Sequence, residues 1–337
     1  MKKRNRLKTS FVTLIKLTLV VVLIRFLADK GFLSIEAIRR ALEQPERIAL
    51  ALLALTFGTV FSIVRWQYLL RAQDIHLSWG KTVQLAMIGN FFNIALPGAV
   101  SGDFVKAFYI AREIHGQRAR AFGSILFDRV AGVSGLVLIS ALALSLSRLE
   151  SGGPSQFTAI SAFVVVAAIG VVGFFGYLFL VPENRDPLFV LFEKAENRVA
   201  RLGSFKRIYI GLRHYHHHRT TVLRSLALSL AIHALVCFAC LQLVVALGDQ
   251  PLSLPALFTV VPLGLLVTAI PVAPAGVGTG HAAFGALFLL LGSKMGANVF
   301  SFMVLHGLLV GALGGLVYLR FKSQLPALPE NPSDAQS

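Results

Sequence analysis

Two apolar stretches of this 337-residue chain are each interrupted by proline and glycine where a membrane-spanning helix would have to continue. The first interruption lies at residues 96–103 and the second at residues 271–281. Proline removes a backbone donor and clashes with the preceding turn, and glycine opens backbone angles that other residues avoid. Each freed amide or carbonyl group needs a partner in lipid, so such breaks persist only within protein or beside water. Interrupted segments in both halves of a chain are typical of proteins that carry a solute across a bilayer.

The composition places these breaks in a membrane protein. Hydrophobic residues make up 55% of the chain, charged residues make up 14%, and the mean hydropathy is +0.72. Such a chain does not fold in water, and its length allows about six to eight spans. We therefore predict an all-α membrane protein, a polytopic helical bundle that fills residues 1–322. A polar, disordered cytoplasmic tail is predicted at residues 323–337.

The formal net charge of +16 arises from short basic segments between the apolar runs. This distribution is typical of cytoplasmic loops, so it indicates topology and predicts no nucleic-acid partner. The chain begins with Lys2 and Lys3, and its last apolar run is followed by Arg320 and Lys322. Both termini are therefore predicted to be cytoplasmic, with the first apolar run retained as a helix rather than cleaved as a signal peptide.

Hydropathy and charge together predict the order of the spans. The two interrupted segments are residues 79–110, with both ends cytoplasmic, and residues 254–291, with both ends outside. We predict that they form two re-entrant hairpins in inverted orientation that meet at mid-depth; full spans without re-entry are the alternative. Full spans are expected at residues 11–28, 48–70, 121–146, 157–181, 222–247 and 299–318, with an amphipathic surface helix at 29–47 and a basic cytoplasmic loop between 181 and 222.

Four charged residues lie in or beside the apolar segments: Asp103, Lys106, Asp128 and Arg129. Each would cost about 2.5 to 3.5 kcal/mol at mid-helix, so each must face protein or water. Asp103 and Lys106 share a helix face and can neutralise each other. Asp128 and Arg129 point about 100° apart, so at least one should reach another segment, with the first hairpin as the near candidate. The structural alternatives are a helix cap at Asp103 and a snorkelling side chain at Arg129.

The same region predicts an anion site. Arginine offers phosphate a planar fork of donors that never deprotonates, which makes Arg129 the expected phosphate ligand. Backbone amides near Gly98, Gly102, Gly276 and Gly278 would add an anion-binding nest.

Amides and histidines beside the breaks complete the candidate set. Asn90 and Asn93 flank two phenylalanines before the first break and are expected to bond freed backbone groups or a ligand. A histidine in a membrane segment usually bonds one helix to another, which is the interpretation for His233 and His306. His281 differs because it lies at the second break itself.

Two other clusters have simpler interpretations. Cys237 and Cys240 share one helix face, where small packing residues are favoured over a redox pair. His214 and residues 216–218 lie in the basic loop without a carboxylate or thiolate at metal-site spacing. They predict an interfacial polar patch rather than a metal site.

The remaining patterns predict packing and anchoring. Gly307, Gly311 and Gly315 recur every four residues in the last span, a spacing that lets helices approach closely. Arg65 and Trp66 lie near the end of the second span, where basic and aromatic residues typically anchor a helix at the membrane surface.

Three motifs occur in order along the chain: Asn93-x-x-Leu96-Pro97-Gly98-x-x-x-Gly102-Asp103, then Asp128-Arg129, then Pro271-x-x-Pro274-x-Gly276-x-Gly278. In this order and spacing they resemble the lysylphosphatidylglycerol synthase transmembrane region family of flippase-like membrane proteins, from the first helix to about residue 322. The resemblance implies a multi-pass protein of the bacterial inner membrane. In the two-domain synthases the membrane half is held to move an aminoacylated phospholipid between leaflets.

The chain departs from the family pattern at three points. His281 stands where many relatives carry Glu, and Ala275 stands where Gly is usual. The soluble aminoacyl-transferase half is absent, so lysyl transfer is not expected. The resemblance implies the following motif positions: Asn93, Pro97, Gly102, Asp103, Asp128, Arg129, Pro274, Gly276 and Gly278.

Residues and resemblance together predict a lipid translocase rather than an enzyme, with an anionic phospholipid or a polyprenyl phosphate as its lipid and no cofactor or metal. A separate lipid-modifying enzyme is a candidate partner. The alternatives are a membrane enzyme or accessory subunit acting on lipid-linked sugars or aminoacylated lipids, with Asp103 or Asp128 as base, and a scaffold without catalysis. The predicted substrate-binding residues are Asn90, Asn93, Pro97, Gly98, Gly102, Asp103, Lys106, Asp128, Arg129, Pro274, Gly276, Gly278 and His281.

Overall fold

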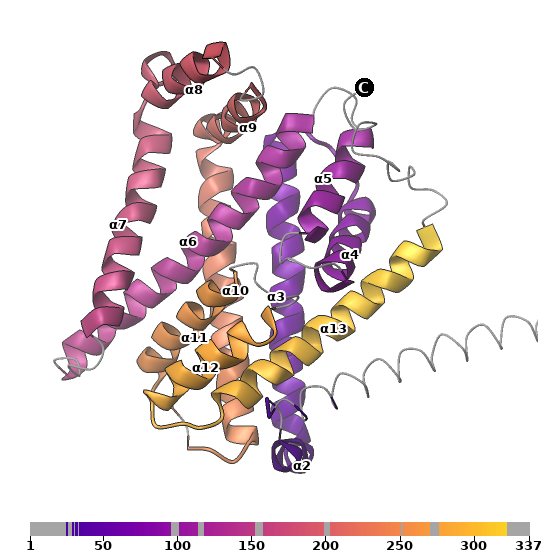
Figure 1. Ribbon diagram of the computed structural model, residues 1–337, viewed down its shortest axis with the longest axis vertical. Helices are drawn as coiled ribbons and strands as arrows, with labels where there is room; N and C mark the ends of the chain where they lie inside the picture. The colour runs from indigo at the N-terminus through magenta and orange to yellow at the C-terminus, as the bar shows by residue number, and fades with distance from the viewer. Residues whose placement is uncertain are drawn as a thin grey trace, which may run out of the picture.

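The computed structural model is helical throughout the part that it describes, which comprises residues 34–95, 101–113, 118–151, 158–198, 203–250, 252–269 and 276–321 together with residues 25, 29, 31 and 32 (Figure 1). Within these residues there is no strand, and five helices are long and apolar enough to cross a membrane. A polytopic helical membrane protein is thereby confirmed. The five long helices are α3 (Pro45–Ala72), α6 (Arg118–Ser151), α7 (Thr158–Leu180), α10 (Arg219–Ala246) and α13 (Gly296–Phe321).

Shorter helices flank both predicted breaks. The first break lies between α4 (Trp79–Ala95) and α5 (Ser101–Glu113), and the second lies between α11 (Leu254–Thr268) and α12 (Thr279–Leu289). In the part of the second motif that the structure describes, residues 276–278 precede α12 and are not α-helical, as the glycine content predicted. Pro97, Gly98 and Pro274 lie outside the described residues.

The start of the chain differs from the prediction in one respect. The single surface helix expected at residues 29–47 is divided, because α2 (Ile35–Glu43) ends before Pro45 and α3 begins there. Proline fits the first turn of a helix, where the missing N–H would have no partner, but it disrupts a helix interior. The predicted first span at residues 11–28 lies almost entirely outside the described residues, as does the tail at 323–337.

Helices α3 and α10 pack side by side at the centre of the bundle (Figure 1). They run antiparallel, since Arg47 near the start of α3 donates to Gln242 near the end of α10 at 2.8 Å, and Arg65 donates to Ser229 at 2.7 Å. Around this pair, α4 packs against α5 and α13, and α11 packs against α12 and α6. Helix α7 lies at the edge of the bundle and contacts α6.

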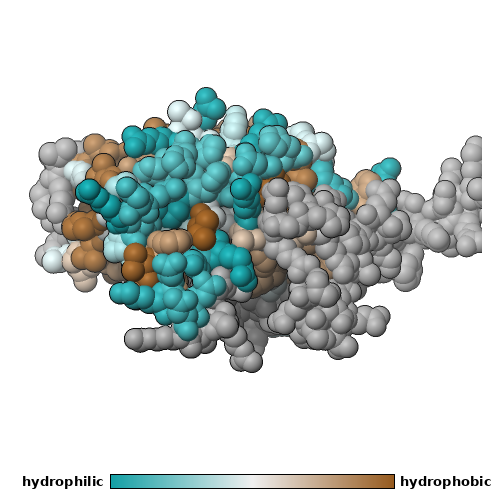
Figure 2. Space-filling view, turned by 90° about the horizontal axis from the view of Figure 1, so that it is seen from above, coloured by the Kyte–Doolittle hydropathy of each residue, from teal (hydrophilic) through white to brown (hydrophobic). Residues whose placement is uncertain are grey.

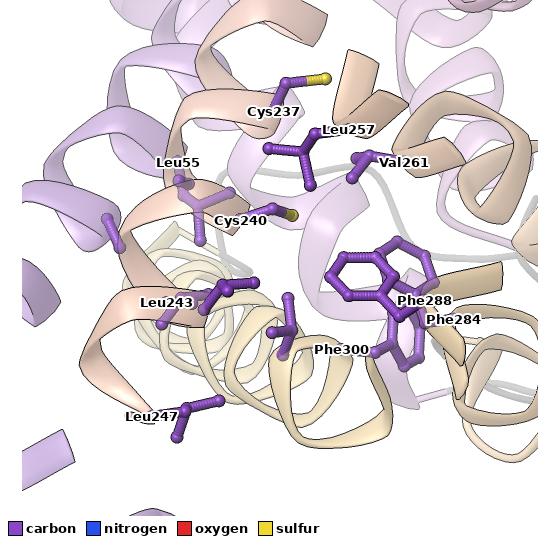
Figure 3. Close-up of a cluster of buried hydrophobic side chains, with 14 of the residues drawn as sticks. Leu55, Cys237, Cys240, Leu243, Leu247, Leu257, Val261, Phe284, Phe288 and Phe300 are labelled. Atoms are coloured by element: carbon purple, nitrogen blue, oxygen red, sulfur yellow. The ribbon is translucent and has the colours of Figure 1, made fainter. Parts of the chain in front are cut away.

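A core of aromatic and small residues joins α10, α11, α12 and α13 (Figure 3). Phe284 stacks on Phe288 and lies against Phe300, and Gly264 of α11 leaves room for the ring of Phe284. Both cysteines are free and buried in this core, where the thiol of Cys240 lies 3.7 Å from the sulfur of a methionine on α13. The packing interpretation of the two cysteines is therefore confirmed.

The glycine stripe of α13 packs against α4, but its members differ from those predicted. A side chain at Gly311 would meet Ile94, and one at Gly315 would meet the ring of Phe91. Gly314 lies against the backbone carbonyl of Met87, whereas a Cβ at Gly307 would meet no described atom within 4 Å. The close approach therefore uses Gly311, Gly314 and Gly315.

The predicted basic loop between α7 and α10 is largely folded. It contains α8 (Pro187–Arg198), α9 (Gly203–Arg213) and two short 3₁₀ helices, η2 (Glu183–Arg185) and η4 (His214–His217). Figure 2 looks down on this end of the molecule, where hydrophilic residues dominate the described surface. This end is called the polar face below.

Candidate functional site

The first pair of short helices is held together by backbone contact. The amide of Gly102 at the start of α5 donates to the side-chain oxygen of Asn93 on α4 at 2.8 Å. A Cβ at Gly102 would collide with the carbonyl group of Gly89, so only glycine permits this approach. Asn93 thus bonds the backbone, and the contact fixes the position of Asp103, the next residue.

Asp103 is the centre of a buried set of charges. Its carboxylate lies 2.7 Å from the ammonium of Lys106 and 2.6 Å from Nε of Arg129 on α6. The side chain of Asp103 is 9% exposed and that of Arg129 is 45% exposed, so the carboxylate is enclosed while the guanidinium reaches outward. Two predictions are confirmed here: Asp103 and Lys106 pair, and Arg129 reaches the first pair of short helices.

A second ion pair lies next to the first. Asp128 accepts from Nε of Arg65 on α3 at 2.8 Å, and Arg65 also donates to Ser229 of α10. The indole ring of Trp66 lies 4.8 Å from the Lys106 ammonium, which is a cation–π distance. The term charge cluster is used below for five residues from three helices, α3, α5 and α6: Arg65, Asp103, Lys106, Asp128 and Arg129.

Sequence reasoning missed Arg65 and Trp66 as members of this site. Both were predicted to anchor the end of α3 at the membrane surface, but they are 6% and 2% exposed. Burial of an arginine without a partner would be costly, and the partners of Arg65 come from α6 and α10. The signal available in the sequence was an arginine before the end of an apolar run, together with an otherwise unpartnered Asp128.

A cavity of about 320 Å³ opens beside the charge cluster. Lys106, Asp128 and Trp66 line one part of it, and Asn90 of α4 is also exposed to it. It is called the central cavity below, because the helices α3, α4, α5, α6, α10 and α13 all contribute. Its other lining residues are Leu55, Gly58, Thr59, Ser62, Ile63, Ala86, Ile232, Val236, Met303 and His306.

The charge cluster carries an excess of positive charge. Among the described residues, the ion pairs join three cationic side chains to two carboxylates, which gives the charge cluster a formal charge of +1. Positive charge near apolar helices is expensive, and an incoming anion would lower that cost. The arrangement therefore favours binding of a monoanion over proton transfer between paired acids.

The second break forms a separate cluster. Gly276 and Gly278 have φ angles of +68° and +91°, which non-glycine residues rarely adopt. His281 accepts from the amide of Gly278 at Nδ1, and its Nε2 lies 3.0 Å from Oγ of Ser301. Ser301 in turn donates to the carbonyl of Phe32, whose ring stacks on the imidazole.

His281 makes its hydrogen bonds away from the central cavity. The described residues that line the central cavity include neither His281 nor the two glycines of the second break. Because Nδ1 accepts a backbone N–H, the ring proton belongs on Nε2, where it points to Ser301. The imidazole caps α12 and connects it to α13 and to the segment before α2.

Three other histidines also have a hydrogen-bond partner. His233 makes the expected helix-to-helix bond, with its Nε2 3.0 Å from the carbonyl of Gly132. In the polar face, His216 lies 2.7 Å from the carbonyl of Leu178 and His217 lies 3.2 Å from Glu183. Among the described residues, no group of three histidine, cysteine or acidic side chains could hold a metal ion.

Comparison with known proteins places these features in a family. The sequence profile described as lysylphosphatidylglycerol synthase TM region matches residues 13–317. The chain belongs to this family. The match includes both pairs of short helices, the charge cluster and helices α8 and α9 of the polar face.

A curated relative agrees with this family. A UPF0104 membrane protein of Pyrococcus horikoshii is 31% identical over 98 residues, which is 28% of this chain and 29% of the length of that protein. No solved structure matches the chain. Family membership and the five apolar helices together establish a multi-pass membrane protein.

Proposed function

We propose that the protein is a lipid translocase of the bacterial inner membrane that binds the phosphate of an anionic phospholipid or a polyprenyl phosphate at the charge cluster. One observation carries this proposal: among the described residues, the charge cluster has a formal charge of +1 and lies beside the central cavity. A phosphate group supplies the missing negative charge, and arginine recognises it in a planar, bidentate manner.

Arg129 is the proposed first contact of the headgroup. The side chain of Arg129 is the most exposed in the charge cluster, at 45%, while that of its partner Asp103 is enclosed. Asp103 thereby keeps the guanidinium oriented without itself repelling an approaching phosphate at close range. Lys106, which lines the central cavity, would receive the headgroup next.

The helix contacts support an inverted repeat. The packing pattern stays the same when the helices α3 to α6 are exchanged, in order, for α10 to α13. The contact between α4 and α13 then corresponds to that between α11 and α6. The contact between α5 and α6 corresponds to that between α12 and α13. The two exchanged elements at the centre, α3 and α10, run antiparallel. This pattern supports two re-entrant hairpins that enter from opposite membrane surfaces, an arrangement suited to alternating access.

Orientation and partners belong to the same proposal. We propose that the polar face, with its many lysine and arginine residues, lies in the cytoplasm together with both termini. The protein then moves lipid without chemical change, and a separate lipid-modifying enzyme would supply or consume that lipid.

Reconstitution into liposomes tests the proposal. The full chain should accelerate the exchange of fluorescent phosphatidylglycerol between leaflets, measured by quenching of the outer leaflet, more than that of phosphatidylcholine. Arg129→Gln should lower the rate about tenfold, the effect of losing about 1.4 kcal/mol of headgroup binding. Arg224→Gln is the matched control, because Arg224 lies in α10 against Tyr68 and outside the charge cluster.

Three results would argue against translocation by this site. Equal rates for both lipids would remove the role of headgroup charge, and equal loss in the control would remove the role of Arg129. A covalent change in the lipid, detected by mass spectrometry, would favour the enzyme alternative instead.

A further inference from the structure

A second cavity, of about 400 Å³, lies at the polar face where the start of α6 meets α9. Figure 2 shows the hydrophilic surface of this end of the molecule. The cavity is called the surface cavity below, because it lies at the ends of spans rather than among them. Its lining residues are Gln73, Ala119, Arg120, Arg207, Ile210, Gly211 and His214.

The backbone leaves this space open. Gly211 of α9 lies against Ala119 and Gly123 of α6, so the two helices approach closely below the cavity. Gln73, which follows α3, donates to the carbonyl of Gly211 at 2.6 Å and is fully buried. Three separate elements are thus fixed around one opening.

The ionisable groups that line the surface cavity are all basic. Arg120 and Arg207 contribute guanidinium groups, and His214 contributes an imidazole. One described carboxylate outside the lining, that of Asp74, pairs with Arg120 at 3.2 Å and lies 3.9 Å from Nε2 of His214. Asp74 does not line the cavity, so it orients Arg120 from outside.

Within the part of the chain that the structure describes, two buried polar atoms of the lining have no hydrogen-bond partner. They are Nε2 of His214 and Oε1 of Gln73. A buried polar atom without a partner is costly, and a bound ligand is one way of satisfying it. Burial lowers the pKa of His214, and the neighbouring His218 and Arg120 lower it further, so the free imidazole is neutral.

We propose that the surface cavity binds a phosphate monoester group, either as a lipid headgroup at the membrane surface or as free phosphate. Its oxygens would accept from both arginines and from the imidazole of His214. Unlike a diester, a monoester has a second pKa of about 6, so a fraction of it keeps a P–OH group near neutral pH, and that form can donate to Oε1 of Gln73. The site is independent of the charge cluster, so it stands or falls separately from lipid translocation.

Titration of inorganic phosphate into the detergent-purified full chain, followed by calorimetry, tests this site. Arg120→Gln and His214→Gln should each weaken binding about tenfold, the ratio that corresponds to about 1.4 kcal/mol. Lys194→Gln is the control: it removes the same charge from the exposed surface of α8, outside the cavity, and should leave binding unchanged.

One variant should act in the opposite direction. Asp74→Asn removes the carboxylate that competes with phosphate for Arg120, so binding should become several-fold tighter. Asp74 has a φ of +59°, and asparagine tolerates that conformation, so the fold is retained. A gain of affinity cannot arise from misfolding.

The lipid source is tested in nanodiscs that contain phosphatidic acid, a monoester, or phosphatidylglycerol, a diester. Phosphate binding without a preference between these lipids assigns the site to free phosphate, and a preference for phosphatidic acid that Arg120→Gln abolishes assigns it to a headgroup. Saturable binding of neither probe overturns the proposal. Equal loss in the Lys194→Gln control also overturns it, since binding would then reflect only the overall charge.

Discussion

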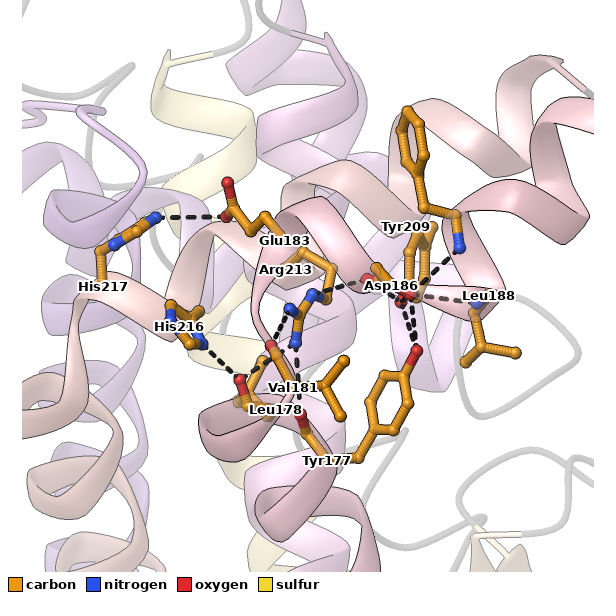
Figure 4. A network of polar contacts seen from close by, with 11 residues as sticks. Tyr177, Leu178, Val181, Glu183, Asp186, Leu188, Tyr209, Arg213, His216 and His217 are labelled. Carbon is orange, nitrogen blue, oxygen red and sulfur yellow. Dashed lines mark hydrogen bonds and ion pairs between the residues drawn. The ribbon is translucent and has the colours of Figure 1, made fainter.

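At the residue scale, Asp186 has the densest set of polar contacts in the polar face (Figure 4). The hydroxyl groups of Tyr177 and Tyr209 donate to its carboxylate at 2.6 and 2.7 Å, and Arg213 lies 2.9 Å away. The amides of Leu188 and Phe189 also donate, so Asp186 caps the start of α8. Arg213 donates further to carbonyl groups at the end of α7, which joins α7, α8 and α9.

The pKa of Asp186 gives this junction a pH dependence. Burial would raise that pKa, but the hydrogen bonds from Tyr177, Tyr209 and a backbone amide, together with the nearby charge of Arg213, outweigh it and hold the pKa below its usual value. Stabilisation by the carboxylate is therefore complete above an unfolded pKa of about 3.9 and is lost as the pH falls through the lower folded value. Asp186→Asn should cost about 3 kcal/mol of unfolding free energy at pH 7, and the difference from wild type should shrink below about pH 4.

Denaturant unfolding of the purified protein at several pH values measures this loss. Glu183→Gln is the control, because Glu183 lies three residues earlier and makes an exposed ion pair with His217, which contributes about 0.5 kcal/mol or less. A constant difference between wild type and Asp186→Asn from pH 7 to pH 3 would show that the carboxylate charge is not what stabilises the junction.

At the element scale, the approach of α13 to α4 depends on glycine at particular positions. A methyl group at Gly314 would strike the carbonyl group of Met87, and a backbone atom cannot move aside as a flexible side chain can. Gly314→Ala should therefore cost about 1 to 3 kcal/mol of unfolding free energy. Gly307→Ala on the same helix meets nothing described within 4 Å and should be neutral or stabilising by up to about 1 kcal/mol. Denaturant titration compares the two, and equal costs would contradict close packing at Gly314.

The elements themselves were largely predictable from the sequence. Five predicted spans correspond to helices that differ from them by a few residues at each end, because long apolar runs with charged flanks specify helix position well. Their partners were less predictable. Gly307 fits the four-residue spacing as well as Gly311 does, and only the position of α4 separates them. Similarly, Arg65 is buried because Ser229 lies 164 residues away in the chain yet adjacent in space.

The candidate site was also only partly predictable from the sequence. Asp103, Lys106 and Arg129 were predictable as a group, because a charge in an apolar run must find a partner and few partners were available. His281 was grouped with them because it lies at a break, but its hydrogen bonds lead to Ser301 and Gly278. A proline and glycine break in an apolar run predicts a polar environment, but it does not predict which other residues pack against it.

At the scale of the whole molecule, the proposed inverted repeat pairs the residues that precede each set of short helices. Ser78 before α4 corresponds to Ser253 before α11, and both are exposed. If each set is a re-entrant hairpin, the chain returns to its starting surface, so Arg120 lies on the side of Ser78 and Lys294 on the side of Ser253.

Cysteine substitutions at these four positions should react with an impermeant maleimide from two opposite sides, in those pairs, when intact cells are compared with inverted vesicles. The two native cysteines are buried, so the unsubstituted chain is the unlabelled control. Labelling of Ser78→Cys and Arg120→Cys from different sides would mean that the first interrupted segment crosses the membrane completely, and the two halves would then no longer be related by inversion.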